Sequence, residues 1–543
     1  MTEKRFIFNS RFSGSKKAML LNGIVCAIPF VFEKAFLISW FAYLPFALLF
    51  LDLAREPETK SFFSKSFAFG YGFYFVGYIW LSELYPLEYL EIDGAIALPL
   101  IVVVVAAVPA IHAAVFAFSA ALCRKLSEKA PLFLRFLAFP CCVVFAEYLQ
   151  SLGTFAFPWC RVFVTQAAFP ALLQSASLFG SYFITYLVLA MNGLWAVAAL
   201  CSHFRIRAAV AAGLLFSLNL TFGLVRLADC ERAYKKNDCF NAVVLQGNYP
   251  YNHKQNDPVS AMYTHYMSLC DEALDELENN PQAAGDTLVL LPETALPVTF
   301  YDRDRGFARL LAEDAKKRGI TLAVGAFSDE SSENDEQDSY GNSVFIFTPD
   351  GNMSAPYSKR HLVPFGEYLP YRRFFEIIFP ALANSDAFGT DLAPGKSEKP
   401  LETPLGKAGV LICYESVFGE LCRKEVLNGA QMLLVSTNDS SFGSSQALRH
   451  HLAQAQMRAI ENNVPVLRAA NTGISALIAP DGRLVKTLGA DKTGYLSGTL
   501  PYGTGTTLYC LIGDRILLLF AAFLGLAALW PQITHMKRNQ HRN

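Results

Sequence analysis

Residues 410–420 read VLICYESVFGE, and this short stretch decides how the second half of the chain is interpreted. Val410, Leu411 and Ile412 have the pattern of a buried strand, and Cys413 follows them directly, beside a phenol and a carboxylate. A free cysteine is usually a small hydrophobic residue of a protein core. The alternative is a reactive thiol at the end of a strand, and the surrounding sequence must distinguish the two.

Around this stretch, residues 229–503 have the composition of an ordinary globular domain in which short apolar runs alternate with polar helical segments. This alternation predicts an α/β domain whose apolar strands are covered on both faces. Pro-Asp-Gly at 349–351 and 480–482 predicts two hairpin turns. The expected strands are 242–246, 287–291, 322–326, 343–348, 408–413, 432–436, 466–470 and 475–478, and the expected helices are 259–278, 304–318, 418–428 and 446–462.

The remainder of the chain has a membrane composition. Only 17% of all residues are charged, whereas soluble proteins have about a quarter, and the deficit lies in residues 1–228 and 508–531. A spanning helix needs about 20 predominantly apolar residues. Eight segments are candidates: 18–32, 35–53, 66–81, 95–122, 131–149, 168–200, 208–225 and 508–530.

The basic residues between these segments predict an orientation, because Lys and Arg are enriched on the cytoplasmic side of a membrane. They gather before the first span, at 55–65, at 124–129, at 205–207 and after the last span, whereas the segment 83–93 is acidic. Eight spans with both termini in the cytoplasm explain this alternation. The first apolar run lacks a small-residue cleavage site and is interpreted as an uncleaved span.

This topology predicts three parts: a transmembrane domain at 1–228, an extracytoplasmic catalytic domain at 229–503, and a C-terminal transmembrane helix and cytoplasmic tail at 504–543. One span suffices to anchor a domain. Seven spans before the domain therefore favour a role in facing lipid or holding substrate over simple anchoring.

Several classes of function have no support in the sequence. The formal net charge of −1 does not favour nucleic-acid binding, and the twelve cysteines form no CxxC pair or Cys/His cluster with zinc spacing. We expect no metal, nucleotide or other cofactor. A disulfide between Cys230 and Cys239 remains open.

Three polar stretches could provide chemistry. LLPETALP (290–297) has Glu293 just beyond an apolar strand, where ligands bind in covered sheets. YSKRHLVPFGEYLP (357–370) contains Lys359 and Glu367, and the third stretch contains Cys413. A cysteine needs a neighbouring base or cation to become a nucleophile, and a carboxylate and an ammonium can supply these roles. Taken singly, the three stretches could equally be a solvated carboxylate, a basic surface loop and a core thiol.

The strand-end Glu, loop Lys and strand-end Cys, in this order within an alternating domain, resemble the carbon–nitrogen hydrolase (nitrilase) superfamily. More narrowly, KRHLVPFGEYLP and CYES between seven spans and one resemble the apolipoprotein N-acyltransferase family. The resemblance implies an α/β/β/α sandwich attached to about eight membrane helices. It implies that Glu293 is the general base, Lys359 the oxyanion stabiliser and Cys413 the nucleophile. Glu367 would support Lys359, and Tyr414 and Glu415 would act around the pocket.

The resemblance also implies a reaction, its partners and its location. An acyl chain would pass from a phospholipid, typically phosphatidylethanolamine, to Cys413 as a thioester, and then to the α-amine of the N-terminal diacylglyceryl-cysteine of a prolipoprotein. The enzyme would lie in the bacterial inner membrane with its catalytic domain on the periplasmic face. A membrane-tethered amidase and an inactive lipoprotein-binding scaffold are the alternatives.

Two further features concern access to the pocket. Residues 371–404 begin with YRRFFEIIFPAL, whose exposed apolar side chains would suit a lid at the membrane interface, although a helix packed on the sandwich is the alternative. The apolar residues of this lid are Phe374, Phe375, Ile377, Ile378 and Phe379. The family often has Trp where this chain has Gln255 and Ser441, which leaves the substrate preference open.

Overall fold

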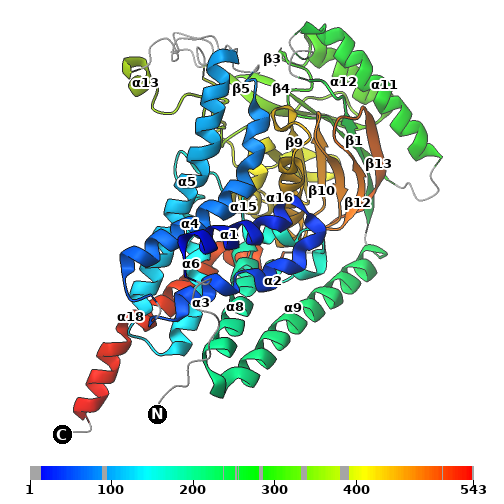
Figure 1. Cartoon of the computed structure of the whole chain (residues 1–543). Helices are drawn as coiled ribbons and strands as arrows, with labels where there is room; N and C mark the ends of the chain where they lie inside the picture. The colour runs from blue at the N-terminus through cyan, green and yellow to red at the C-terminus, as the bar shows by residue number, and fades with distance from the viewer. Residues whose placement is uncertain are drawn as a thin grey trace. The chain divides into compact units, whose positions relative to one another are not determined.

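The computed structural model describes residues 14–54, 56–87, 94–236, 238–250, 254, 256–279, 285–331, 339–378, 391–503 and 506–540. The chain divides into two compact units (Figure 1). One comprises Met1–Ser82, Val102–Arg226 and Ile512–Asn543, and the other comprises Glu83–Ile101 and Leu227–Leu511.

The first unit is helical. Six helical segments of the described chain are long and apolar enough to cross a membrane, namely Glu33–Leu51, Gly94–Ser127, Leu132–Leu149, Ser181–Leu200, Ser202–Tyr234 and Leu508–Thr534. The prediction of a polytopic helical membrane domain is therefore confirmed. The helices of these segments are α2 (Ser39–Ala42), α3 (Leu44–Leu51), α5 (Gly94–Ser127), α6 (Leu132–Leu149), α8 (Ser181–Leu200), α9 (Arg205–Tyr234), α17 (Leu508–Ile512) and α18 (Ile516–Gln540).

Two of the eight predicted spans, 18–32 and 66–81, correspond to helices that are shorter or more polar. These are α1 (Lys16–Val31), with 16 residues, and α4 (Thr59–Tyr78), which contains Lys60 and Lys65. The predicted span 168–200 is wrong in its first part. Gly180, with φ +77°, separates α8 from the short helix α7 (Ala176–Phe179), and apolar composition alone does not reveal this break.

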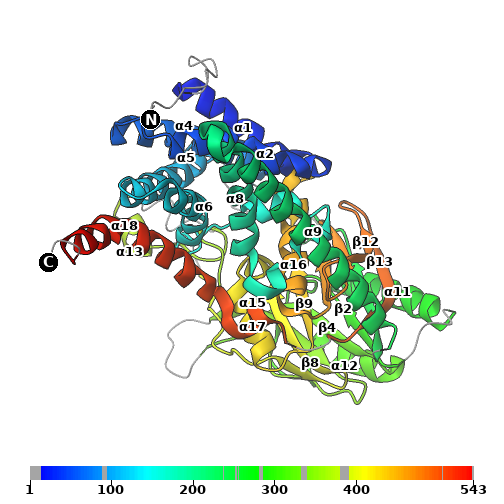
Figure 2. The same ribbon diagram turned by 90° about the horizontal axis from the view of Figure 1, so that it is seen from below.

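Helices α1 and α4 lie side by side (Figures 1 and 2), and two glycines allow their close approach. A Cβ atom on Gly23 would lie 2.0 Å from the carbonyl oxygen of Phe69, and one on Gly72 would lie 2.3 Å from that of Leu20. Small residues at such contacts let membrane helices pack backbone to backbone. Any side chain at either position would force the two helices apart.

The second unit contains two sheets. The seven-stranded sheet has the order β13-β1-β2-β4-β5-β6, with β3 paired to β4, and the six-stranded sheet has the order β12-β11-β10-β9-β8-β7. The strands of the first sheet are β1 (Cys239–Gln246), β2 (Thr287–Leu290), β3 (Thr299–Phe300), β4 (Thr321–Asp329), β5 (Tyr340–Phe347), β6 (Tyr357–Ser358) and β13 (Gly494–Pro501). Those of the second are β7 (Leu401–Thr403), β8 (Gly406–Ile412), β9 (Met432–Thr437), β10 (Val466–Ala470), β11 (Ser475–Ile478) and β12 (Leu484–Leu488).

The two sheets form the middle of a four-layered α/β/β/α sandwich, as predicted. Along β1, Val243 and Leu245 pack in one core with residues of α11 (Val259–Glu278) and α12 (Gly306–Arg318). The intervening Ala242 and Val244 pack in a second core, shared with β8, β9 and β10 of the other sheet. A third core joins that sheet to α15 (Gly419–Leu427) and α16 (Gln446–Asn462). Alternation with a period of two assigns each strand residue to one of these cores.

The eight predicted strands and four predicted helices of this unit are all present, with small shifts at their ends. The turn at 480–482 joins β11 to its antiparallel partner β12. Five strands were not predicted, namely β3, β6, β7, β12 and β13, because they are very short, or exposed like β12, or interrupted by glycine like β13. The predicted strand 408–413 ends one residue early, so Cys413 begins the next turn. Cys230 and Cys239, both within the described residues, form no disulfide with each other.

The α1–α4 contact gives a testable prediction. Gly23→Ala is expected to lower the free energy of unfolding of the detergent-solubilised protein by about 1–3 kcal/mol, because overpacking forces backbone shifts. Gly213→Ala in α9 is the matched control, since a Cβ atom there meets nothing within 4 Å. Thermal unfolding should show a lower midpoint only for Gly23→Ala, and equal midpoints would contradict the close-packed contact.

Candidate active site

Glu293 lies just beyond β2, in a turn with an unusual backbone. Thr294 has φ +44°, a left-handed conformation that is a true outlier for a β-branched residue. The turn packs onto β4 at Gly325, where a Cβ atom would lie 2.3 Å from the Pro292 carbonyl oxygen. Glycine at 325 is therefore required for the turn to sit against the sheet.

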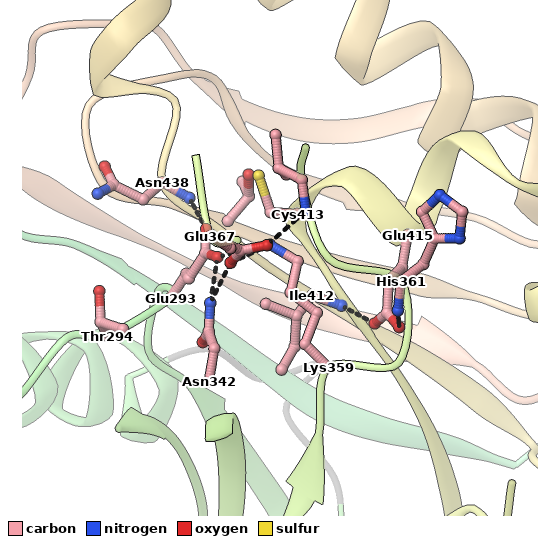
Figure 3. Close-up of polar contacts among 12 residues, drawn as sticks. Glu293, Thr294, Asn342, Lys359, His361, Glu367, Ile412, Cys413, Glu415 and Asn438 are labelled. Carbon is pink, nitrogen blue, oxygen red and sulfur yellow. Dashed lines mark hydrogen bonds and ion pairs between the residues drawn. The ribbon is translucent and has the colours of Figure 1, made fainter. Parts of the chain in front are cut away.

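The Glu293 carboxylate accepts hydrogen bonds on both oxygens. Its Oε1 accepts from Asn342 Nδ2 at 2.7 Å and from Lys359 Nζ at 3.2 Å, and its Oε2 accepts from the backbone N–H of Asn438 at 2.7 Å (Figure 3). Asn342 belongs to β5, and Asn438 follows β9 of the other sheet. The carboxylate is thus fixed by groups from both sheets.

Lys359 follows β6 and is 1% exposed. Its ammonium lies between two carboxylates, since Nζ donates to Glu367 Oε1 at 2.7 Å as well as to Glu293. Burial by itself lowers the pKa of Lys359, but the charges of Glu293 and Glu367 outweigh it and raise the pKa above its usual range. The lysine is therefore a permanent cation.

Glu367 is held independently of Lys359. Its Oε2 accepts from the backbone N–H of Val363 at 2.7 Å, and its Oε1 also accepts from Asn342 Nδ2 at 3.0 Å. Asn342 therefore links the two carboxylates that flank the ammonium. The supporting role of Glu367 stays a prediction.

Cys413 stands at a sharp turn where β8 ends and a single helical turn, Cys413–Val417, begins. Its φ is +52°, and such strain persists only when the surroundings enforce it. The Cys413 carbonyl oxygen accepts from Ser416 Oγ at 2.8 Å and lies 3.1 Å from His451 Nε2. The thiol lies beside the Glu293–Lys359–Glu367 cluster (Figure 3), and the charges of Glu293 and Lys359 both act on it.

The thiol is not a preformed thiolate. Burial and the charge of Glu293 raise the pKa of Cys413 well above its usual range, although Lys359 opposes this shift. At neutral pH the sulfur therefore keeps its proton until a base removes it. Glu293 is a carboxylate suited to that role, because it faces the same small space (Figure 3).

Glu415 ties the cysteine turn to the lysine loop. Its Oε2 accepts from the Ile412 N–H at 2.8 Å and the Tyr357 hydroxyl at 3.0 Å, and its Oε1 accepts from the N–H groups of Arg360 at 2.8 Å and His361 at 3.2 Å. The carboxylate is fully buried. Its contacts therefore connect the residue before Cys413 to the residues after Lys359.

The aromatic ring of Tyr414 packs against Phe418, with centroids 5.1 Å apart, and against His361, with centroids 5.7 Å apart. Lys359, Cys413 and Glu293 converge as the sequence predicts.

Three contributors to this site were missed. Asn342 lies within a strand and Asn438 acts through its backbone, so neither has a recognisable sequence pattern. Lys254 donates from Nζ to the Glu293 carbonyl oxygen at 2.8 Å and to Thr294 Oγ1 at 2.6 Å. Its position in a polar loop after β1 was the only available signal.

The predicted lid is partly described. Phe374 and Ile377 of α13 (Arg372–Ile378) are 57% and 78% exposed. Phe379 and Gln255 lie outside the described residues, as do the side chains of Phe375 and Ile378. Ser441 lies in the turn Ser440–Phe442 after β9.

The raised pKa of Cys413 predicts its reactivity towards iodoacetamide. The alkylation rate of the Cys413 peptide, followed by mass spectrometry, should keep rising with pH between about 6 and 9, because only the thiolate reacts. Lys359→Met should move this rise to higher pH, since the cation lowers the pKa of the thiol. A plateau near neutral pH in the unmodified protein would show instead that the thiolate is already formed.

The contacts of Glu415 predict a large effect of a small change. In Glu415→Gln, an amide N–H₂ group replaces one of two oxygens that each accept from a backbone N–H, so two donors face each other and a buried hydrogen bond is lost. The free energy of unfolding should therefore fall by about 3 kcal/mol. Glu402→Gln is the matched control, because the Glu402 side chain is 74% exposed. Thermal unfolding with equal midpoints for both variants would contradict a structural role for Glu415.

Two protein families match this chain, and each matches mainly one of its two units. Residues 22–194 match the apolipoprotein N-acyltransferase N-terminal domain, and residues 246–508 match the carbon-nitrogen hydrolase family. An apolipoprotein N-acyltransferase of Geobacter metallireducens is 28% identical over 91% of each chain, and one of Rhodopseudomonas palustris is 30% identical over 87% of each chain. The crystal structure of a carbon-nitrogen hydrolase from Helicobacter pylori matches 52% of this chain and 94% of its own, with 18% identity and a TM-score of 0.36.

Proposed function

The chain belongs to the apolipoprotein N-acyltransferase family, and from this premise we propose that it moves an acyl chain from a phospholipid, through a thioester on Cys413, to the α-amine of a lipoprotein. The observation that carries the proposal is the Glu293–Lys359–Glu367 cluster beside Cys413 (Figure 3), in which the Lys359 ammonium donates to both carboxylates. The charges of Glu293 and Lys359 both act on the Cys413 thiol. A nucleophile, a base and a fixed cation are the groups that acyl transfer requires.

In the first half-reaction, Glu293 takes the thiol proton while the sulfur attacks the ester carbonyl carbon of the phospholipid. The oxyanion that forms is stabilised by the Lys359 ammonium, which keeps its proton. The carbon–oxygen bond then breaks, and the departing alkoxide takes the proton from Glu293. The products are a thioester on Cys413 and a lysophospholipid.

In the second half-reaction, the α-amine of an N-terminal diacylglyceryl-cysteine attacks the thioester carbonyl carbon. Glu293 accepts the proton of the attacking amine and passes it to the sulfur as the carbon–sulfur bond breaks. An amide forms, and Cys413 is restored as a thiol. Splitting the transfer into two steps at one cysteine makes each step easier.

Substrates that are anchored in a membrane would explain why the chain has a whole helical unit. A single helix would be enough if the unit served only to anchor the second one. The exposed Phe374 and Ile377 of α13 support a lid that contacts acyl chains at the membrane interface. The basic residues between the helices support an orientation with the catalytic unit on the periplasmic face of the inner membrane. Phosphatidylethanolamine is the proposed donor and a diacylglyceryl prolipoprotein the proposed acceptor.

Intact-mass spectrometry tests the first half-reaction. The purified protein, incubated with phosphatidylethanolamine, should gain one fatty-acyl mass that neutral hydroxylamine removes. Cys413→Ser should abolish the hydroxylamine-sensitive mass. Cys239→Ser, which removes a partly exposed thiol of the same unit, should retain it.

A diacylated lipopeptide then tests the second half-reaction, and its acylation at the amine should discharge the enzyme. Loss of the acyl group to water at the same rate with or without the peptide would favour a tethered hydrolase. If no phospholipid acylates Cys413, the proposed transferase function is wrong.

A further inference from the structure

We propose that Lys254 is a positioning residue of the active site, whose ammonium holds the turn after β2 in its left-handed conformation at Thr294 and thereby directs the Glu293 carboxylate towards Cys413. The proposal rests on the role of Glu293 as the base in the proposed function. In this proposal Lys254 takes no part in the reaction, and its ammonium binds the backbone of Glu293 and the hydroxyl of Thr294, not the Glu293 carboxylate.

The turn needs an external support. Thr294 is β-branched and has φ +44°, a conformation that costs of the order of 1–3 kcal/mol and persists where neighbouring groups enforce it. Gly325 permits the turn to lie against β4, but a glycine only removes an obstacle. The turn also has two backbone hydrogen bonds, from the Ala295 N–H to the Pro292 carbonyl oxygen and from the Leu296 N–H to the Gly325 carbonyl oxygen, each at 3.2 Å. Neither bond involves Glu293 or Thr294, so a group that binds both of these residues would favour the conformation further.

Lys254 has the contacts of such a group. Its Nζ donates to two oxygens of consecutive residues, the backbone oxygen of Glu293 at 2.8 Å and the hydroxyl of Thr294 at 2.6 Å. One ammonium thus joins both residues of the turn. Rotation of the backbone out of the left-handed region would separate these two oxygens and break at least one of the bonds.

The loop that carries Lys254 is anchored at its start. The backbone N–H of Asn248 donates to the Asn471 carbonyl oxygen at 3.0 Å. The side chain of Asn471 accepts from the Tyr249 N–H at 3.0 Å and donates to the Tyr249 carbonyl oxygen at 2.6 Å. The lysine therefore extends from a segment fixed to the end of β10.

The buried ammonium of Lys254 forms no ion pair with a carboxylate of the described residues. Among the residues that the structure describes, no carboxylate oxygen lies within 4.0 Å of its Nζ, and both recorded acceptors are neutral. Burial lowers the pKa of Lys254 to about 8, against the opposing charges of Glu293 and Cys413. Burying an ammonium without a paired carboxylate is costly, and such groups concentrate at functional sites.

The test measures acylation of Cys413 in the full-length protein with p-nitrophenyl butyrate, whose burst of p-nitrophenol needs neither phospholipid nor lipoprotein. Lys254→Met is expected to lower the acylation rate constant at least about tenfold, because small displacements of a catalytic group are costly. The ester concentration at half-saturation should change less than about threefold, since ester binding is not altered. Lys317→Met, at an exposed position of α12, is the matched control.

A second substitution separates positioning from other roles. Glycine adopts positive φ without strain, so in a Thr294→Gly background Lys254→Met should change the rate constant less than about twofold. An equal loss in both backgrounds would show that the lysine acts by its charge on the thiol or ester, and would overturn the proposal. Lys254→Met indistinguishable from Lys317→Met would also overturn it.

Two further outcomes are informative. If Lys254→Met fails to fold, Thr294→Val removes the hydroxyl acceptor with little change of shape, and an unchanged acylation rate in that variant would overturn the proposal. A parent protein that is acylated by the ester and never by a phospholipid would contradict the proposed function alone. A parent that shows no burst with the ester would contradict both.

Discussion

The candidate active site depends on one buried ammonium, that of Lys359, held between the carboxylates of Glu293 and Glu367. An ammonium with 1% exposure is stable only when its charge is paired and its hydrogens are bonded. Each carboxylate is in turn fixed by a different segment, Glu293 by the N–H of Asn438 and Glu367 by the N–H of Val363. Removing the Lys359 ammonium would leave two carboxylates unpaired in the interior, so the cluster depends on this one cation.

Two strained residues surround this cluster, and their supports come from elsewhere in the sandwich. Thr294 and Cys413 both have positive φ. The first is packed against Gly325, and the second has its carbonyl oxygen bound by Ser416 and adjacent to His451. His451 thus lies at the backbone of the cysteine turn.

The sequence predicts most of the sandwich because short apolar runs alternate with polar helical segments, and that local pattern survives folding. It also points to Glu293, Lys359 and Cys413, through their order within an alternating domain and the family resemblance of the motifs that contain them. It does not predict Asn342 or Lys254, whose roles depend on strand pairing and on a loop crossing the sheet edge. The prediction of one span at 168–200 is wrong in its first part because the helix breaks at Gly180. One glycine within an apolar run does not change the composition from which the span was predicted.

The two carboxylates around one lysine have different consequences for the proposed reaction. Glu293, Glu367 and Lys359 together carry one negative charge in excess, which helps to keep the thiol protonated before an acyl group arrives. When Glu293 accepts the thiol proton, the negative charge moves from its carboxylate to the oxyanion, and the total charge does not change. Glu293 then attracts the ammonium less, while Glu367 keeps it charged. A single carboxylate would have to accept the thiol proton and also pair with the ammonium. With two carboxylates, Glu293 can accept the proton while Glu367 stays paired with Lys359.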